Sequence, residues 1–217
     1  MKEKTIKAIL ENKIIAIVRN ISPYKVLPLA QALYDGGIRL VEVTFNQAHE
    51  NGEDETAGII KKLNEQLGDR MCIGAGTVMT VRQAKIAFDS GAEYLISPNT
   101  DIEVIKKAGD LGIESIPGAL TPSEAVLAHN NGADFVKLFP AGELGTDYIK
   151  ALMAPLNHIS FLAVGGIDTD NIRQFQALGI KGFGIGSNIV KASLVNQDKY
   201  ADIALLASKF VQNIKME

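Results

Sequence analysis

The chain has 217 residues, of which 47% are hydrophobic and 22% charged. This composition is typical of a folded globular protein with a sizeable core, and the length suits one domain over residues 1–217. The formal net charge of −3 provides no basic surface, so the sequence predicts no nucleic-acid partner.

The cysteine and histidine content argues against disulfide and metal chemistry. Cys72 is the only cysteine, so no internal disulfide can form, which fits a reducing cytoplasm. The histidines His49, His129 and His158 are isolated and lack metal-ligand spacing. The charged start of the chain has no secretory pattern, and no apolar run approaches membrane-spanning length. We therefore expect a cytoplasmic protein with no metal and no membrane partner.

Short apolar runs alternate with longer helical patterns from one end of the chain to the other. An opening helix is predicted over residues 3–12 and a final helix over 200–214. The predicted strands cover residues 14–19, 40–45, 71–77, 94–98, 114–118, 135–140, 160–165 and 182–187. The predicted helices between them cover residues 23–35, 56–67, 81–90, 101–111, 123–130, 146–155 and 170–178.

Cap residues precede several of these helices. Ser22 and Thr121 stand before prolines, while Thr80 and Asp101 precede apolar-periodic stretches. The segment 46–55 is polar and rich in carboxylates, which predicts a solvated loop. Eight strand–helix units favour a closed (β/α)8 TIM barrel, with the opening helix covering the bottom. An open doubly wound sheet usually has fewer strands, and no Gly-x-Gly-x-x-Gly follows the first strand.

Lys137 lies in the sixth predicted strand, in the run Phe135-Val136-Lys137-Leu138-Phe139. Side chains alternate along a strand, so Lys137 shares one face with Phe135 and Phe139. Burial there lowers the pKa of a lysine, and a neutral amine can attack a carbonyl to form a Schiff base. The structural alternative is a lysine whose ammonium extends to water at the strand end.

Glu42 faces the same interior if Val41 and Val43 face the helices. A buried carboxylate and a buried lysine are tolerable together, either as a simple ion pair or as a proton shuttle beside an iminium. The last two strands end at Gly165-Gly166 and Gly186-Ser187, where this fold usually binds phosphate. Tight turns without a ligand are the alternative for these glycines.

Arg19 ends the first predicted strand. Its guanidinium is suited to a carboxylate or a phosphate, and a surface ion pair is the alternative. We also expect Ser187 to add a hydroxyl donor and to cap a short helix that follows.

These residues occur in the order found in a known family. The sequence resembles the 2-keto-3-deoxy-6-phosphogluconate / 4-hydroxy-2-oxoglutarate aldolases from about Lys13 to Ala192. The motifs that carry the resemblance are Ile-Ala-Ile-Val-Arg19, Glu42-Val-Thr, Gly74-Ala-Gly-Thr-Val78, Ser97-Pro98, Ile116-Pro-Gly118, Val136-Lys-Leu-Phe-Pro140, Gly165-Gly166 and Gly186-Ser187.

The resemblance implies a class I aldolase that needs no cofactor. It implies that Lys137 forms the Schiff base and that Glu42 is the general acid/base. Residues implied to line the site are Arg19, Thr77, Pro98, Phe139 and Val164. The implied partners are a small 2-keto acid substrate and pyruvate, and the implied assembly is a homotrimer.

Two positions resemble the galactonate branch of these aldolases. Asn46 stands where the phosphogluconate enzymes commonly have arginine, and Val164 stands where they have threonine. Tyr148–Leu152 also resembles that branch, whereas Val43 retains the gluconate-like pattern. Two alternatives remain at this point: a phosphosugar epimerase or isomerase, and a non-catalytic protein that binds a phosphosugar acid.

Overall fold

The computed structural model describes residues 1–215, in which helices and strands alternate. The strands are β1 (Ile14–Val18), β2 (Leu40–Thr44), β3 (Cys72–Gly76), β4 (Tyr94–Ile96), β5 (Glu114–Ile116), β6 (Gly118–Ala119), β7 (Phe135–Leu138), β8 (Ser160–Val164) and β9 (Gly182–Ile185). The helices are α1 (Lys2–Asn12), α2 (Pro23–Asp35), α3 (Gly52–Leu67), α4 (Val81–Asp89), α5 (Ile102–Asp110), α6 (Pro122–Asn130), α7 (Ala141–Met153), α8 (Ile172–Ala177), α9 (Ala192–Asn196) and α10 (Tyr200–Lys215).

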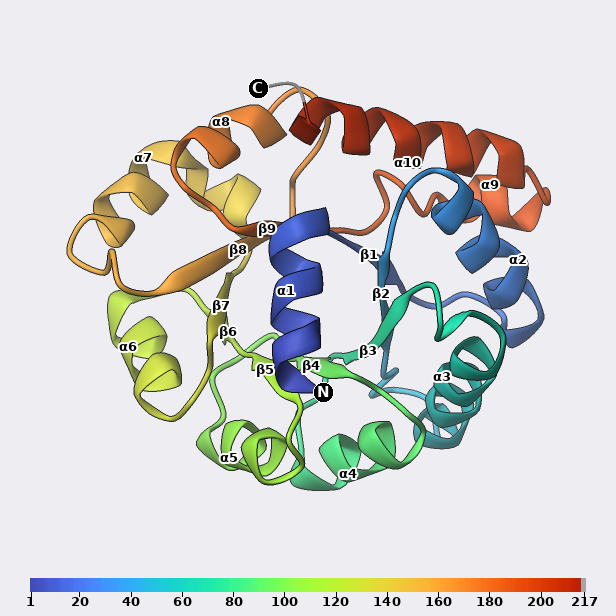
Figure 1. Cartoon of the computed structure of the whole chain (residues 1–217), viewed down its shortest axis with the longest axis horizontal. Coiled ribbons are helices and arrows are strands. Elements are labelled where there is room, and N and C mark those ends of the chain that lie inside the picture. Colours follow the sequence, from blue (N-terminus) through green and yellow to red (C-terminus); the bar gives the residue numbers. More distant parts are fainter. Residues whose placement is uncertain (216–217) are drawn as a thin grey trace.

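The strands form a parallel barrel surrounded by helices, which confirms the predicted fold (Figure 1). The fifth predicted strand is divided into β5 and β6 at Pro117, which has no N–H to donate. The Pro117 carbonyl still accepts a hydrogen bond from the Lys137 N–H at 2.8 Å. Because β5 pairs with β4 and β6 pairs with β7, this one segment joins the two ends of the sheet.

Alternating side chains of the strands supply two apolar layers. Leu40, Tyr94 and Phe135 belong to a cluster inside the barrel. Val41 and Val136 belong to a second cluster, which the helices cover. The predicted alternation in β2 and β7 is therefore confirmed, and it places Glu42 and Lys137 on the inner face.

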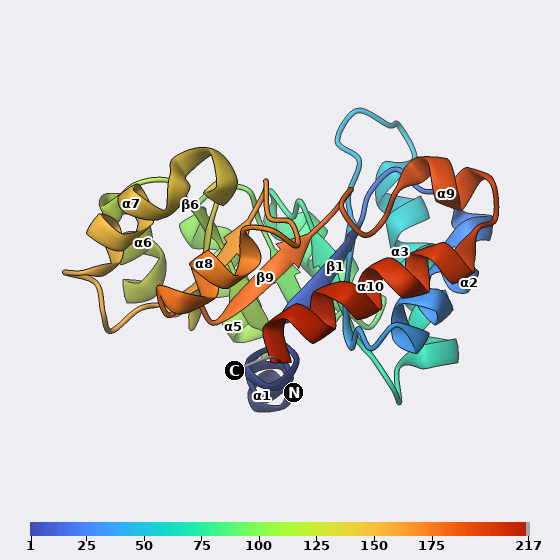
Figure 2. The same cartoon turned by 90° about the horizontal axis from the view of Figure 1, so that it is seen from above.

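Helix α1 closes one end of the barrel, as predicted. Ile9 is fully buried and belongs to the interior cluster. Figure 2 shows α1 lying across the end of the barrel where the strands begin, opposite the loops that follow them. Within residues 1–215, no helix is both long and apolar enough to cross a membrane.

All four predicted cap residues precede their helices, and the side chains of three of them accept hydrogen bonds from the first turn. Thr80 and Asp101 accept hydrogen bonds from backbone N–H groups in the first turns of their helices. Thr121 and Glu124 form a reciprocal capping box. Ser22 is the N-cap residue of α2, as predicted, but its side chain accepts no hydrogen bond from the first turn; Pro23 lacks one of the N–H groups that need a partner.

Other local predictions need correction. The end of the predicted polar loop is helical, because α3 begins at Gly52 with three acidic residues in its first turn, where the helix dipole favours them. Helix α7 begins at Ala141 rather than at residue 146 and is interrupted at Gly145, whose φ is 74°. His129 and His158 are not isolated in space, since their ring centroids lie 5.2 Å apart.

A buried acidic group lies near the start of α1. Glu114 has no exposed surface, and its Oε2 has no hydrogen-bond partner. Lys2 lies 3.7 Å from this oxygen but 2.5 Å from Asp134, so its charge serves mainly Asp134. Burial, with a smaller contribution from Asp134, raises the pKa of Glu114 to about 9. We therefore expect Glu114 to be protonated at neutral pH.

The raised pKa predicts that stability falls as pH rises. Folded Glu114 holds its proton up to about pH 9, whereas the unfolded group loses it near its ordinary value of 4.5. Between these values the folded state binds more protons, so the free energy of unfolding decreases with pH. Glu114→Gln should flatten this slope and raise the melting temperature at pH 8, by roughly 2–4 °C for each kcal/mol gained.

Thermal unfolding between pH 5 and pH 8 would measure this effect. Glu103→Gln is the control, because Glu103 is exposed on α5. A slope that persists in Glu114→Gln would show that another group causes it.

Candidate active site

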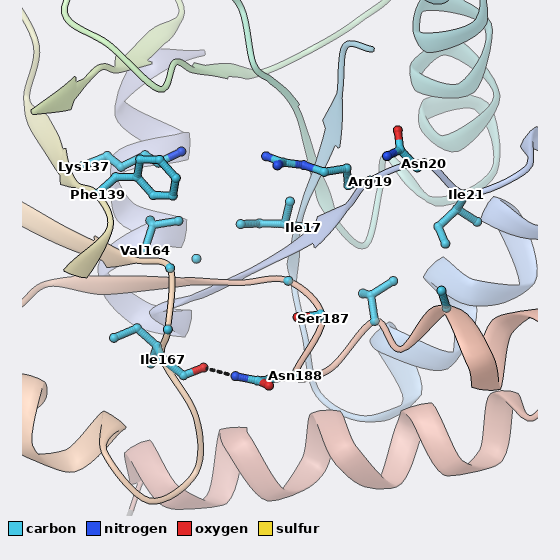
Figure 3. A pocket seen from close by; sticks show the side chains of 16 residues that line it. Ile17, Arg19, Asn20, Ile21, Lys137, Phe139, Val164, Ile167, Ser187 and Asn188 are labelled. Carbon is cyan, nitrogen blue, oxygen red and sulfur yellow. Dashed lines mark hydrogen bonds between the residues drawn. The ribbon is translucent and has the colours of Figure 1, made fainter. Parts of the chain in front are cut away.

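A cavity of about 450 Å³ opens where the strands end. Its walls come from β1, β7, β8 and β9 and from the loops that follow them (Figure 3). Eight of the eleven predicted site residues line it: Arg19, Lys137, Phe139, Val164, Gly165, Gly166, Gly186 and Ser187. The loops after β1, β8 and β9 add lining residues that the sequence analysis did not name.

Lys137 is 4% exposed and extends from β7 into the cavity. Its Nζ lies 4.7 Å from the ring centroid of Phe139, which stands at the mouth of the cavity. Burial lowers the pKa of the Lys137 ammonium; Arg19 lowers it further, while Glu42 opposes the shift. A lowered pKa increases the fraction of neutral amine, which is the nucleophilic form.

Glu42 is 1% exposed and lies behind the cavity wall rather than on it. Its Oε2 has no hydrogen-bond partner. Burial raises the pKa of this carboxyl, and the charges of Lys137 and Arg19 compensate only in part. A raised pKa makes this carboxylate a stronger base than an exposed glutamate, which suits a general acid/base.

Gly76 makes room for the Glu42 side chain. A Cβ at Gly76 would lie 1.8 Å from Glu42 Oε1 and 2.4 Å from its Cδ, too close for any real contact. Gly74, two residues earlier on β3, makes room for Tyr94 in the same way. The Gly-Ala-Gly motif thus fits large side chains from β2 and β4 into a barrel whose interior is close-packed.

Glu42 and Lys137 interact through their charges but make no direct contact. Each shifts the pKa of the other. Among the hydrogen bonds and ion pairs of residues 1–215, none joins them. The simple Glu42–Lys137 ion pair that the sequence allowed as an alternative is therefore absent from the described residues.

Arg19 follows β1, is exposed, and faces Lys137 across the cavity in Figure 3. It takes part in none of the ion pairs of the described residues, so the surface pair considered from the sequence is absent. A guanidinium beside a buried amine gives the cavity a positive potential. An anionic substrate would be attracted to it.

The glycines after β8 adopt backbone conformations that favour glycine. Gly165 has φ 87° and Gly166 has φ 70°, both in the left-handed region. After β9, residues 187–189 form a turn, and α9 begins only at Ala192. The prediction that Ser187 caps a short helix was therefore wrong. Its hydroxyl remains at the cavity wall.

Thr77 and Pro98 do not line the cavity. Thr77 follows β3 with φ 56°, an unusual conformation for a β-branched residue. Gln47 holds it there, since its Nε2 donates to the Thr77 carbonyl at 2.8 Å. Pro98 packs against the next strand: a Cβ at Gly118 would lie 2.3 Å from the Pro98 carbonyl oxygen. Gly118 lies on β6, which pairs with β7, so one short strand separates Pro98 from the strand that carries Lys137.

Val164 ends β8, is 4% exposed, and forms part of the cavity wall. Gly184 on β9 provides its space, because a Cβ there would lie 2.8 Å from a Val164 methyl group. The wall at this point is apolar and offers no hydrogen-bond donor.

Sequence reasoning missed Asn20 and Asn188, which also line the cavity. Asn20 has φ 54°, and the Asn188 amide donates to the Ile167 carbonyl at 2.7 Å. Each directly follows a residue that was named. Asparagine tolerates left-handed backbone, which was the available signal for Asn20. Gly76 belongs to the Gly-Ala-Gly motif, but the space that it gives to Glu42 depends on the neighbouring strand β2, which the motif does not reveal.

The arrangement suits covalent chemistry on a carbonyl compound. A buried amine with a lowered pKa can form an iminium, and a nearby carboxyl with a raised pKa can move protons. The positive potential and the glycine loops favour anionic groups at the ends of the substrate.

Comparison with known proteins gives a consistent result. The family model described as "KDPG and KHG aldolase" matches residues 5–206. A 2-dehydro-3-deoxy-6-phosphogalactonate aldolase of Escherichia coli is 36% identical over 82% of this chain and 85% of its own length. A 2-dehydro-3-deoxy-phosphogluconate aldolase of Haemophilus influenzae is 30% identical over 98% of both chains.

A solved structure is also similar. It is a KDPG aldolase from Legionella pneumophila with pyruvate captured as a covalent carbinolamine intermediate. Its TM-score is 0.83 and its sequence identity 27%, over 93% of this chain and 95% of its own.

The geometry predicts opposite effects of two neighbours on the pKa of Lys137. Glu42→Gln removes a negative charge and should lower that pKa further, whereas Arg19→Gln removes a positive charge and should raise it. The pH dependence of Lys137 labelling by an amine-reactive reagent, followed by peptide mass spectrometry, would measure both shifts.

The exposed Lys191 in the same digest controls for the reagent. The absence of a shift in both variants would mean that burial alone sets the pKa of Lys137.

Proposed function

Because the chain belongs to the KDPG and KHG aldolase family, we propose that it is a Schiff-base aldolase, a carbon–carbon lyase. It cleaves 2-keto-3-deoxy-6-phosphogluconate or its galactonate epimer to pyruvate and glyceraldehyde 3-phosphate. It also cleaves 4-hydroxy-2-oxoglutarate to pyruvate and glyoxylate. The observation that carries the proposal is a buried lysine of lowered pKa at a cavity wall, with a buried carboxyl close behind.

In the proposed mechanism, neutral Lys137 attacks the 2-keto carbon to give a carbinolamine. Loss of water then leaves an iminium, whose positive charge attracts electrons from the C3–C4 bond. The iminium supplies the electron sink that a metal ion provides in other enzymes, so the chemistry requires no cofactor.

Glu42 moves the protons in this scheme. Directly or through a water, it takes the C4 hydroxyl proton as the C3–C4 bond breaks and the aldehyde leaves. The same carboxyl then protonates the remaining enamine at C3, and hydrolysis of the new iminium releases pyruvate and free Lys137. The raised pKa of Glu42 suits both directions of transfer.

The remaining site residues would bind the substrate. Arg19 is placed to attract an anionic group, and Phe139 covers one side of Lys137. We assign Thr77 and Pro98 to the barrel rim after β3 and β4, where they would contact a substrate that reaches beyond the open cavity. The phosphate would bind at Gly165, Gly166, Gly186 and Ser187, through backbone N–H groups and the Ser187 hydroxyl.

Two other functions were considered from the sequence. A phosphosugar epimerase or isomerase needs no covalent lysine, and a non-catalytic binding protein need bury neither Lys137 nor Glu42. The family match and the aldolase names of the relatives favour the aldolase over both.

We further propose that residues 1–217 form one aldolase domain, that it assembles as a homotrimer and that it acts in the cytoplasm. The basis is the family resemblance. Light scattering that gives three times the chain mass would support the trimer.

Covalent trapping tests the central step. Borohydride in the presence of pyruvate should add a three-carbon adduct to Lys137, located by peptide mass spectrometry. Lys137→Ala should abolish both adduct and turnover, and Lys137→Arg should not restore them, because guanidinium stays protonated. An adduct on Lys13 or Lys181, or none, would remove the basis for this assignment.

Glu42→Gln should lower turnover by about two to four orders of magnitude, the usual contribution of acid/base catalysis. The substitution keeps the size of the side chain and removes the titrating group. Steady-state kinetics would measure the loss, while pyruvate trapping on Lys137 should persist.

A second variant displaces the same carboxylate without changing it. Gly76→Ala should also lower turnover, because the added methyl group occupies the position of Glu42 Oε1. Gly109→Ala is the matched control, since a Cβ there meets nothing within 4 Å. Near-normal turnover in Glu42→Gln would reduce Glu42 to a charge that stabilises Lys137.

The apolar wall at Val164 predicts weak discrimination between the C4 epimers. Valine cannot donate a hydrogen bond to the C4 hydroxyl, so rates on the two substrates should lie within about tenfold, roughly 1.4 kcal/mol. Val164→Thr should shift the preference toward the gluconate epimer. A thousandfold preference in the unsubstituted protein, measured in parallel assays, would mean that another contact sets the stereochemistry.

A further inference from the structure

In the loop after β8, three successive backbone carbonyls each accept a hydrogen bond from another part of the chain. The Gly165 carbonyl accepts from the Gly142 N–H of α7 at 2.8 Å. The Gly166 carbonyl accepts from the Asn171 side chain at 2.8 Å. The Ile167 carbonyl accepts from the Asn188 side chain at 2.7 Å, as Figure 3 shows. Three successive peptide groups are thus each fixed by a donor from a different part of the chain.

This arrangement determines where the N–H groups point. In a trans peptide, the N–H points away from the carbonyl of the preceding residue. With the Gly165 and Gly166 carbonyls held by Gly142 and Asn171, the N–H groups of Gly166 and Ile167 are turned the other way. Within residues 1–215, neither N–H has a hydrogen-bond acceptor in the protein, and both residues line the cavity.

Asn171 does not line the cavity, but its side chain is hydrogen-bonded to this loop. It directly precedes α8, yet its side chain caps no helix N–H. Its amide nitrogen donates to the Gly166 carbonyl, and its Oδ1 accepts from the Asp168 N–H at 2.9 Å. The Asp168 carboxylate in turn accepts from the Asn171 N–H at 2.9 Å. The Asn171 side chain therefore makes its hydrogen bonds to the loop and not to the first turn of α8.

We infer that Asn171 is a positioning residue for the phosphate site of the proposed aldolase. It acts by fixing the Gly166–Ile167 peptide so that the N–H, and not the carbonyl oxygen, faces the bound anion. Glycine at position 166 leaves ψ on one side of this peptide free to rotate, and a carbonyl turned toward the cavity would repel the phosphate. The inference rests on the proposed function, and it assigns a role in that function to Asn171, which lies outside the cavity.

Kinetics on two substrates test the inference. Asn171→Ala should raise KM for 2-keto-3-deoxy-6-phosphogluconate roughly tenfold, the effect expected from one lost hydrogen bond. The KM for 4-hydroxy-2-oxoglutarate, which has no phosphate, should change less than about twofold on the same basis. The inhibition constant of inorganic phosphate should rise in parallel with the first value.

A second variant keeps the shape of the side chain. Asn171→Asp retains the acceptor for the Asp168 N–H, loses the donor to Gly166 and adds a negative charge, so its loss should exceed that of alanine. The matched control is Asn131→Ala. Asn131 also donates its amide to a backbone carbonyl at 2.8 Å, but at the end of α6, outside the cavity. It should leave all three constants unchanged.

Equal losses on both substrates, or no change on either, would overturn the inference. Absence of cleavage by the unsubstituted protein would instead overturn the proposed function. In that case, calorimetry of inorganic phosphate binding tests the role of Asn171 independently of turnover. Binding that weakens in Asn171→Asp but not in Asn131→Ala supports it, and equal binding in the three proteins, or none in the unsubstituted one, overturns it.

Discussion

A buried lysine and a buried glutamate that both face the interior of one barrel are the constraint on which the rest of the site depends. Each charge is costly to remove from water, and each lowers the cost of the other only in part. The pKa of Lys137 is therefore lowered and that of Glu42 raised. The pair is brought closer to the neutral forms that nucleophilic and proton-transfer chemistry need, and the free energy that permits this comes from the apolar layers around it.

Small residues make that burial possible. Gly76 gives space to Glu42, Gly74 to Tyr94, and Gly184 to Val164. In each case the large side chain and the glycine are on adjacent strands, so the interior is filled by alternation of large and small groups. The same glycines constrain the chemistry, because a methyl group at any of them would displace a neighbour. The glycines that allow the barrel interior to pack therefore also fix the position of Glu42, on which the proposed catalysis depends.

The two ends of the barrel use buried polar groups differently. At the end covered by α1, Glu114 has a raised pKa and lies close to Lys2 and Asp134 without facing the cavity. Its burial affects stability. At the other end, loops follow the strands, and their backbone groups are held by side chains such as Asn171 and Gln47. Precise orientation there comes from hydrogen bonds outside the cavity, which leaves the lining free to bind substrate.

The sequence by itself determined the repeated units, the inward direction of Lys137 and Glu42, and the glycines at two strand ends. These follow from local rules, since strand side chains alternate and glycine marks special backbone. Only the tertiary structure decided that Pro117 divides a strand, that α3 begins at Gly52, and that Thr77 and Pro98 lie outside the open cavity. Contacts such as Gly76 with Glu42, or Asn171 with Gly166, depend on strand register and loop geometry. Spacing along the chain does not encode these, because they arise only when the barrel closes.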